Sequence, residues 1–213
     1  RRNIPYYLLV GYNSYYLQNF DALSTSTPGW SIGNVASDNA TSGKWVIDYP
    51  KCSLLSGDTV QTNRDHSSGI GKCAVTGNSG TNGASANSYD VDGGRTTIIT
   101  EKFQLAPFTQ PVFSYYRWYT NSQDVANDPG KDYWKAYITY NDGATWTMAE
   151  KTIIPDLRWR RSVIVPDLTL GTEVRLMFIA TDSTSTTFGG TLVDAALDDI
   201  EILALNSTST GVK

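Results

Sequence analysis

The stretch at residues 190–203 constrains the fold more than any other part of the chain. From Ala196 onward, apolar residues recur at every second position, which predicts a β-strand. Ala196, Ile200 and Ile202 have one parity and are expected to share a buried face. Asp198 has the same parity, so we expect its carboxylate to point into that face. A lone carboxylate on a buried face is unfavourable unless it is paired, protonated or bound to a cation. Asp198 is therefore a candidate cation ligand.

The composition favours one large β domain. The chain has 213 residues, of which 18% are charged and 12% are aromatic, and Gly, Ser, Thr and Asn are abundant. The net charge of -4 gives no support to a nucleic-acid partner or an anionic membrane. No apolar run approaches the roughly 18 residues that a membrane span requires.

Turn signals divide the chain into short apolar segments without helical periodicity. Residues 95–105 alternate, residues 111–119 form an aromatic strand, and Asn141-Asp142-Gly143 is a compact hairpin signal. We expect roughly nine to eleven strands in an all-β antiparallel β-sandwich. The predicted organisation is an N-terminal strand or inter-domain segment at 1–14, a sandwich at 15–205 and a Ser/Thr-rich linker at 206–213.

The run from Ile4 to Tyr12 is apolar and aromatic, and would be an exposed edge strand prone to association if nothing covered it. Either this domain or a neighbouring copy could cover it. In the second case the chain would form a filament by strand addition.

The sequence lacks the common catalytic motifs. HExxH, GxSxG and a phosphate-binding glycine loop are all absent. The single histidine, His66, lies in a turn-like segment, and no nucleophile is singled out beside it. We therefore predict that the chain is not an enzyme.

Cys52 and Cys73 are the only cysteines, so one pairing is possible. In an extracellular chain they are a disulfide candidate, and the alternative is two small buried thiols.

The segment Asp90-Val91-Asp92-Gly93-Gly94 places two carboxylates at i and i+2 before two glycines. Such a turn can wrap a hard cation with oxygen ligands. The alternative is an ordinary turn, because Asp and Gly are favoured in turns.

Two aromatic segments, 115–119 and 158–161, could form a ligand platform. Tyr116, Trp118 and Trp159 are the candidate stacking residues for a glycan. The alternative is a pair of alternating strands whose tryptophans point inward while the arginines stay solvated.

Several short motifs, in their order along the chain, resemble the MAM-type jelly-roll family. They are Asn19-Phe20-Asp21, Pro28-Gly29-Trp30, Asp65-His66-Ser67-Ser68-Gly69-Ile70-Gly71 and Leu197-Asp198-Asp199-Ile200. A second set resembles the bacterial MAM-like module of secreted zinc carboxypeptidases and surface adhesins: 74–78, 90–94, 116–119 and 192–196. The resemblance covers roughly residues 15 to 205.

The resemblance implies a jelly-roll sandwich, also similar to galactose-binding folds, that holds structural Ca2+ between the first loop and the last strand. It places Asp21, Asp65 and Asp198 as ligands, with Asp199 beside them. Asp90, Asp92 and Asp194 would form a second acidic site. The family's disulfide framework is not matched by Cys52 and Cys73.

The expected function is that of a secreted, cell-surface bacterial module for adhesion or self-assembly, stabilised by calcium. Its partners would be other copies of the chain or surface proteins. The alternatives are a carbohydrate-binding module or an inert spacer attached to a secreted metallopeptidase.

Overall fold

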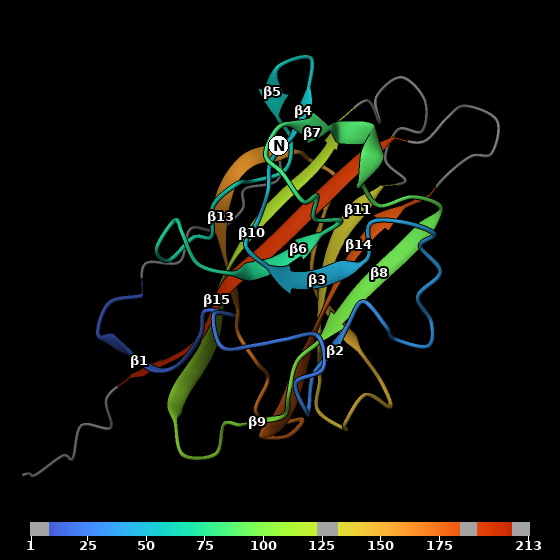
Figure 1. Cartoon of the computed structure of the whole chain (residues 1–213). Coiled ribbons are helices and arrows are strands. Elements are labelled where there is room, and N and C mark those ends of the chain that lie inside the picture. The colour runs from blue at the N-terminus through green and yellow to red at the C-terminus, as the bar shows by residue number, and fades with distance from the viewer. Residues whose placement is uncertain (1–8, 123–131, 184–190, 206–213) are drawn as a thin grey trace, which may run out of the picture.

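The computed structural model describes residues 9–122, 132–183 and 191–205, which build two packed sheets (Figure 1). The first sheet has the order β13 (Asp156–Ile164), β10 (Thr109–Ser122), β15 (Leu192–Leu205), β6 (Cys73–Thr76) and β3 (Trp45–Asp48), with β1 (Tyr12–Gln18) also paired to β15. The second sheet has the order β12 (Thr147–Thr152), β11 (Tyr133–Thr139), β14 (Glu173–Asp182), β8 (Gly94–Ile99) and β2 (Ser31–Ile32), with β9 (Phe103–Gln104) also paired to β14.

Every strand pair within these two sheets is antiparallel. A small third sheet joins β5 (Asp58–Thr59), β4 (Ser53–Leu55) and β7 (Ala84–Ser85), and a short 3-10 turn, η1, spans Ala86–Ser88. The predicted all-β antiparallel sandwich is therefore confirmed. In the described part of the chain, no helix has the length and apolar character that crossing a membrane demands.

Large aromatic side chains fill the space between the two sheets. Trp45 of β3 meets Trp134 of β11 edge to face, with ring centroids 6.1 Å apart. Tyr115 of β10 packs against Phe178 of β14 in the same manner, at 4.9 Å. All four side chains are almost completely buried, and such burial is the dominant stabilising contribution in a sandwich of this kind.

The last strand, β15, changes the face that it buries at Asp199. Ala195 and Leu197 before this point, and Ile200 after it, belong to the core between the sheets. Asp199 has a φ of 48°, and the ladder between β10 and β15 shifts register between Ser114 and Tyr116. A bulge of this kind inserts one residue and reverses the alternation. The prediction that Asp198 shares a face with Ile200 was therefore wrong.

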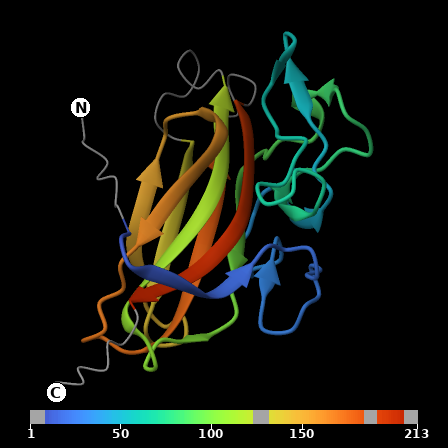
Figure 2. The same ribbon diagram turned by 90° about the vertical axis from the view of Figure 1, so that its left-hand side faces the viewer.

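Asp198 instead points to the outer face of the first sheet, and residues 49–93 cover that face. Trp118 and Ala196 form a small second core there with Cys73 and Val75. The indole Nε1 of Trp118 donates to the carbonyl of Val60 at 2.7 Å. In Figure 2 the cyan part of the chain, which contains β4 and β5, lies beside the red strand β15. The covering segment is what makes the outer face a buried environment.

The first described strand belongs to the sandwich. β1 pairs with β15 from Tyr12 opposite Leu205 to Gln18 opposite Ile200, so residues 12–14 lie in the first sheet. The rest of the predicted N-terminal segment at 1–8 and the predicted linker at 206–213 lie outside the described residues.

The predicted hairpin at residues 141–143 connects β11 to β12. The hydroxyl of Thr139 donates to Asn141 Oδ1, and Asn141 Nδ2 donates to Thr145 Oγ1, each at 2.9 Å. Asp142 has a φ of 56°, a left-handed conformation that Asp tolerates in tight turns.

Candidate functional site

Three aspartates from distant parts of the chain meet at the edge of the covering segment; we name Asp21, Asp65 and Asp198 the aspartate clasp. The backbone N–H of Lys72 donates to Asp21 Oδ1 at 2.8 Å, and the adjacent N–H of Gly71 donates to Asp65 Oδ1 at 2.9 Å. Asp198 Oδ2 accepts the backbone N–H of His66, the residue after Asp65, at 2.7 Å. The first loop, the 65–72 loop and β15 are thereby tied together.

Gly71 shows how closely two of these carboxylates approach. A Cβ atom at this position would lie 2.5 Å from Asp21 Oδ1 and 3.1 Å from Asp65 Oδ2. Both carboxylates therefore face one small space, beside a backbone that cannot carry a side chain. The oxygens around it are hard donors of the type that Ca2+ prefers.

Asp199 holds the same loop from the other side. Its carboxylate contacts His66 Nδ1 at 2.6 Å and accepts the hydroxyl of Ser67 at 2.5 Å. Because the Ser67 hydroxyl and the imidazole both contact the same carboxylate, the group is not a serine–histidine–aspartate relay. Asp199 therefore positions the loop that carries Asp65.

The charges in the clasp are uncompensated. Burial, the charge of Asp199 and the charge of Asp65 raise the pKa of Asp198 to about 8. Burial also disfavours the ionised form of Asp65, but hydrogen bonds from Ser68 and Gly71 outweigh it and lower the pKa of this carboxyl. Among the described residues, no Lys or Arg forms an ion pair with Asp21, Asp65 or Asp198.

The donor set fits a hard cation, but it does not enclose one by itself. Within the described ranges, no three acidic, histidine or cysteine side chains already surround a common point at metal-binding distance. Asp21 Oδ1, Asp65 Oδ1 and Asp198 Oδ2 each accept a backbone N–H. A carboxylate oxygen with one such bond retains a second lone pair. Calcium completes its shell of 6–8 oxygens with backbone carbonyls and water.

The three candidate stacking aromatics lie together but do not form an open platform. Tyr116 stacks on His66 with ring centroids 3.4 Å apart. Trp118 is only 8% exposed and packs edge to face against Trp159 at 6.3 Å. Since their rings contact other rings of the chain, Tyr116, Trp118 and Trp159 are explained by packing of the covering segment.

The predicted disulfide is not present. Cys52 and Cys73 are both free and buried. Cys73 lies in β6 in the second small core, where burial and the charges of Asp198 and Asp65 raise its pKa well above the usual value. Cys52 is held in a different environment, with its backbone N–H donating to Asn82 Oδ1 at 3.0 Å.

A second acidic group lies where β8, β14 and β15 meet; we name Asp90, Asp92, Asp182 and Asp194 the carboxylate cluster. Asp90, Asp182 and Asp194 are each at most 3% exposed. Burial and the charges of Asp92, Asp194 and Asp182 raise the pKa of Asp90 to about 8. Burial raises the pKa of Asp194 to about 7, opposed by a hydrogen bond from Ser53. Val91 N–H donates to the carbonyl of Val193, and Gly93 N–H donates to Asp182 Oδ2, so the predicted segment at 90–92 lies beside the predicted Asp194, and Asp182 lies beside the same segment.

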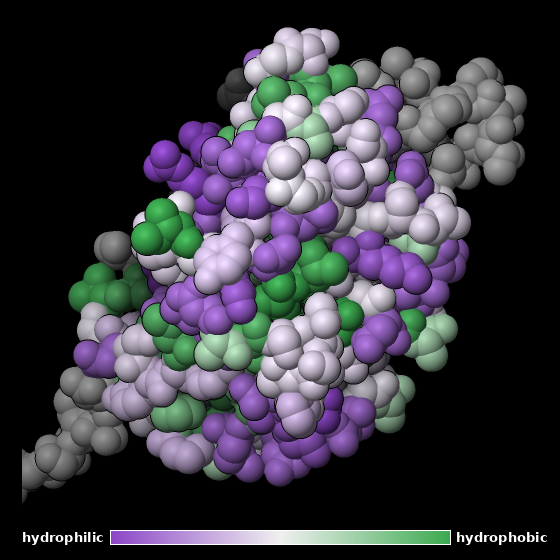
Figure 3. Space-filling view, viewed as in Figure 1, coloured by the Kyte–Doolittle hydropathy of each residue, from purple (hydrophilic) through white to green (hydrophobic). Residues whose placement is uncertain are grey.

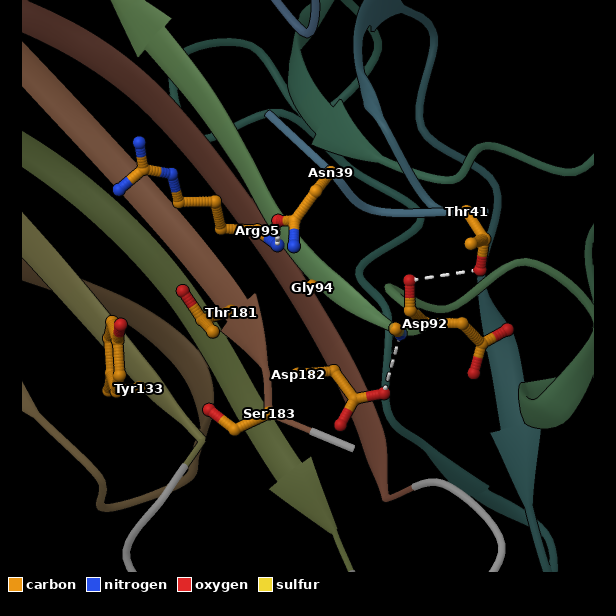
Figure 4. Close-up of a pocket in the computed structure, with 10 residues that line it drawn as sticks. Asn39, Thr41, Asp92, Gly94, Arg95, Tyr133, Thr181, Asp182 and Ser183 are labelled. Carbon is orange, nitrogen blue, oxygen red and sulfur yellow. Dashed lines mark hydrogen bonds between the residues drawn. The ribbon is translucent and has the colours of Figure 1, made fainter. Parts of the chain in front are cut away.

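An open groove of about 690 Å³ adjoins this cluster (Figure 4). Tyr133 lies at one end, Thr41 and Asp92 lie at the other, and Asp182 lies between them. The rest of the lining is polar and consists of Asn39, Gly93, Gly94, Arg95, Thr181 and Ser183. Hydroxyl, amide, guanidinium and carboxylate groups beside one aromatic ring are suited to a ligand rich in hydroxyl groups.

Tyr133 and Asp182 are among the groove residues that sequence analysis missed. Each lies at the end of a strand, Tyr133 at the start of β11 and Asp182 at the end of β14. The available signal was an acidic residue that closes an apolar strand. That signal does not reveal which other strand ends lie nearby.

Among known proteins, the chain is similar only to solved structures. No family model matches the chain, and no curated protein matches it. The C-terminal family 22 carbohydrate-binding module of Clostridium thermocellum Xyn10B is 10% identical with a TM-score of 0.42, over 92% of this chain and 96% of that chain. Caldicellulosiruptor saccharolyticus CBM27-1, solved with mannohexaose, is 9% identical with a TM-score of 0.45, over 89% and 96%. TmCBM61, solved with beta-1,4-galactotriose, is 8% identical with a TM-score of 0.41, over 87% and 97%.

None of these likenesses names the MAM-type family, so membership of that family stays a prediction.

Proposed function

We propose that the chain is a non-catalytic extracellular β-sandwich module that binds a neutral oligosaccharide in the groove beside Tyr133. The observation that carries the proposal is the groove itself, which is open, polar and bordered by one aromatic ring. Sugars are recognised by hydrogen bonds to their hydroxyl groups and by stacking of their apolar faces on aromatic rings. The face of the molecule shown in Figure 3 mixes hydrophilic, intermediate and apolar residues, and its apolar residues lie in several separate groups.

Replacing the groove tyrosine should remove glycan binding. We expect Tyr133→Ala to weaken the affinity at least about 10-fold, because a stacking ring contributes on the order of 1–2 kcal/mol. A glycan array would identify the ligand, and calorimetry would then compare the variants. Tyr49→Ala is the matched control, because Tyr49 is 51% exposed, lies outside the groove and has Lys72 near its ring, just as Lys135 and Lys151 lie near the ring of Tyr133. Unchanged affinity in Tyr133→Ala, or loss in Trp159→Ala alone, would contradict the proposal.

We also propose that the aspartate clasp binds Ca2+. This proposal is supported by the oxygen donors around Gly71 and by the raised pKa of Asp198, whose ionised form is disfavoured in the absence of a cation. An ion would neutralise three carboxylates that otherwise repel one another, and would join the first loop to the last strand. Extracellular modules bind calcium at the millimolar concentrations present outside cells, which agrees with a secreted location.

Chelation should lower the melting temperature, and more strongly at pH 8 than at pH 5. The pKa of Asp198 is raised in the folded state, so the stability gained from its protonation is lost as the pH rises from about 4 through 8. At pH 5 the carboxyl is neutral and needs no cation. At pH 8 calcium at 100 times its Kd contributes about 2.7 kcal/mol, or about 5–10 °C. Melting curves with and without EDTA test this expectation. An equal shift at both pH values, or none, would contradict it.

Adhesion or self-assembly receives no separate support from the described residues. The part of the N-terminal run that the structure describes, from Tyr12 onward, pairs with the chain's own β15. The apolar residues Ile4–Leu8 lie outside the described residues. The glycan groove therefore provides the better-supported function.

A further inference from the structure

Asp90 is a buried acid with one oxygen that no described group satisfies. The residue is 3% exposed, and its Oδ1 atom is buried without a hydrogen-bond partner. Buried carboxylate oxygens are normally hydrogen-bonded, so a single orphaned oxygen calls for a partner that protein atoms do not supply. Val91 N–H donates to the carbonyl of Val193 and Gly93 N–H donates to Asp182 Oδ2, so the turn that carries Asp90 lies beside Asp194 and Asp182.

Asp90, Asp92 and Asp194 have no positively charged partner in the part of the chain that the structure describes, where no Lys, Arg or His forms an ion pair with any of them. The nearest arginine in the groove, Arg95, extends away from Asp182 (Figure 4), and its Nε donates to the carbonyl of Ser37 at 3.0 Å. Several buried carboxylates without a cation would repel one another at neutral pH.

The turn that contains Asp90 packs directly against neighbouring backbone segments, unlike an ordinary surface turn. A Cβ atom on Gly43 would lie 2.3 Å from the carbonyl oxygen of Asp90, so the two backbones are in direct contact. The hydroxyl of Ser42 donates both to this carbonyl at 2.9 Å and to Asp92 Oδ2 at 2.6 Å. Val91 N–H donates to the carbonyl of Val193 at 2.9 Å, which fixes the turn against β15. The backbone that carries Asp90 and Asp92 is thus held in place within the fold.

We propose that the carboxylate cluster binds a divalent cation of the Ca2+ type through Asp90, separately from the aspartate clasp. All side-chain donors in the cluster are carboxylate oxygens, which select hard cations. These side chains do not yet surround one point, so water and backbone carbonyls complete the shell. Asp194 and Asp198 are four residues apart in β15, about 13 Å at roughly 3.3 Å per residue, so one ion cannot serve both groups.

The proposal does not depend on glycan binding, and a metal count tests it directly. The full chain is stripped with EDTA, reloaded with CaCl2 and weighed by native mass spectrometry. We expect two calcium ions on the wild type, one on Asp90→Asn and one on Asp198→Asn. Asp58→Asn is the control, because Asp58 is exposed in β5, and it should retain two.

The counts also separate the two calcium proposals. A wild type that binds one ion, retained in Asp90→Asn and lost in Asp198→Asn, overturns the second site and leaves the clasp intact. One ion lost in Asp90→Asn alone supports the second site and overturns the clasp. Because Asp90→Asn could unfold the chain, Asp194→Asn provides an independent variant, and it too should bind one ion fewer. A wild type without bound calcium overturns the proposal whatever the variants do.

Discussion

Asp198→Ala is expected to lower the free energy of unfolding by about 2–5 kcal/mol, because two buried backbone donors lose their acceptor. The carboxylate accepts the N–H of His66 at 2.7 Å and the N–H of its neighbour Asp199 at 2.8 Å. Asp198 is fully buried, so water cannot replace the lost acceptor. The 65–72 loop would lose one of its attachments to β15, and the covering segment would become easier to open.

Urea unfolding at about pH 4 with chelator present isolates this effect. At that pH the carboxyl of Asp198 is neutral in the folded state, since its pKa there is about 8, and it is about half protonated in the unfolded state, so hydrogen bonds account for most of the measured change. Asp142→Ala is the control, because the Asp142 side chain is 55% exposed and its ion pairs with Lys102 and Arg175 are at the surface. We expect the control to change stability by at most about 1 kcal/mol. Equal losses in both variants would contradict the burial of Asp198.

Gly77→Ala should be the most damaging small substitution in the covering segment. A Cβ atom at Gly77 would lie 1.4 Å from the carbonyl oxygen of Tyr89, which is backbone and cannot rotate away. The residue also has a φ of 49°, which disfavours any side chain. Relieving the clash requires separation of the segment after β6 from the turn that carries Asp90. We expect a loss of more than about 4 kcal/mol, or a chain that fails to fold.

Gly80→Ala is the matched control, because no atom lies within 4 Å of a Cβ at that position. It should change stability by at most about 0.5 kcal/mol. Circular dichroism and urea unfolding of both variants measure the difference. Near-native stability in Gly77→Ala would show that the two backbones are not in contact.

The alternation of apolar and polar residues was sufficient to predict the class of fold. The same pattern gave the wrong side-chain direction where one extra residue interrupts a strand. Residues 111–119 lie within β10, because period-two patterns reflect the geometry of the pleat, whereas the run at 95–105 forms two strands, β8 and β9, with residues 100–102 between them. The side of the sheet to which Asp198 points could not be predicted from the alternation of apolar residues. It depends on a bulge at Asp199, where φ is 48°, and no local sequence pattern indicates that bulge. The prediction that Asp198 is buried succeeded, although the surface that buries it is a different one.

The groove could not be predicted, because its parts are unrelated in sequence. Asn39, Asp92, Tyr133 and Asp182 come from four separate segments, and the pairing of β11, β14 and β8 in the second sheet brings them together. The predicted glycan-stacking residues were wrong for a different reason, because residues that are adjacent in sequence are buried by another part of the chain. Tyr116 and Trp118 lie in one conspicuous segment, but their rings are covered by the long connection between β3 and β8.

The position of β15 in the first sheet has a consequence for biosynthesis. This final strand pairs with β1, β6 and β10, and it carries an aspartate of each acidic group. A ribosome-bound chain that lacks residues 192–205 would expose the unpaired edges of all three neighbours, together with the apolar side chains meant to lie beneath them. The sandwich can close only after its last strand has emerged, so the nascent chain must remain protected from aggregation until translation of this domain is complete.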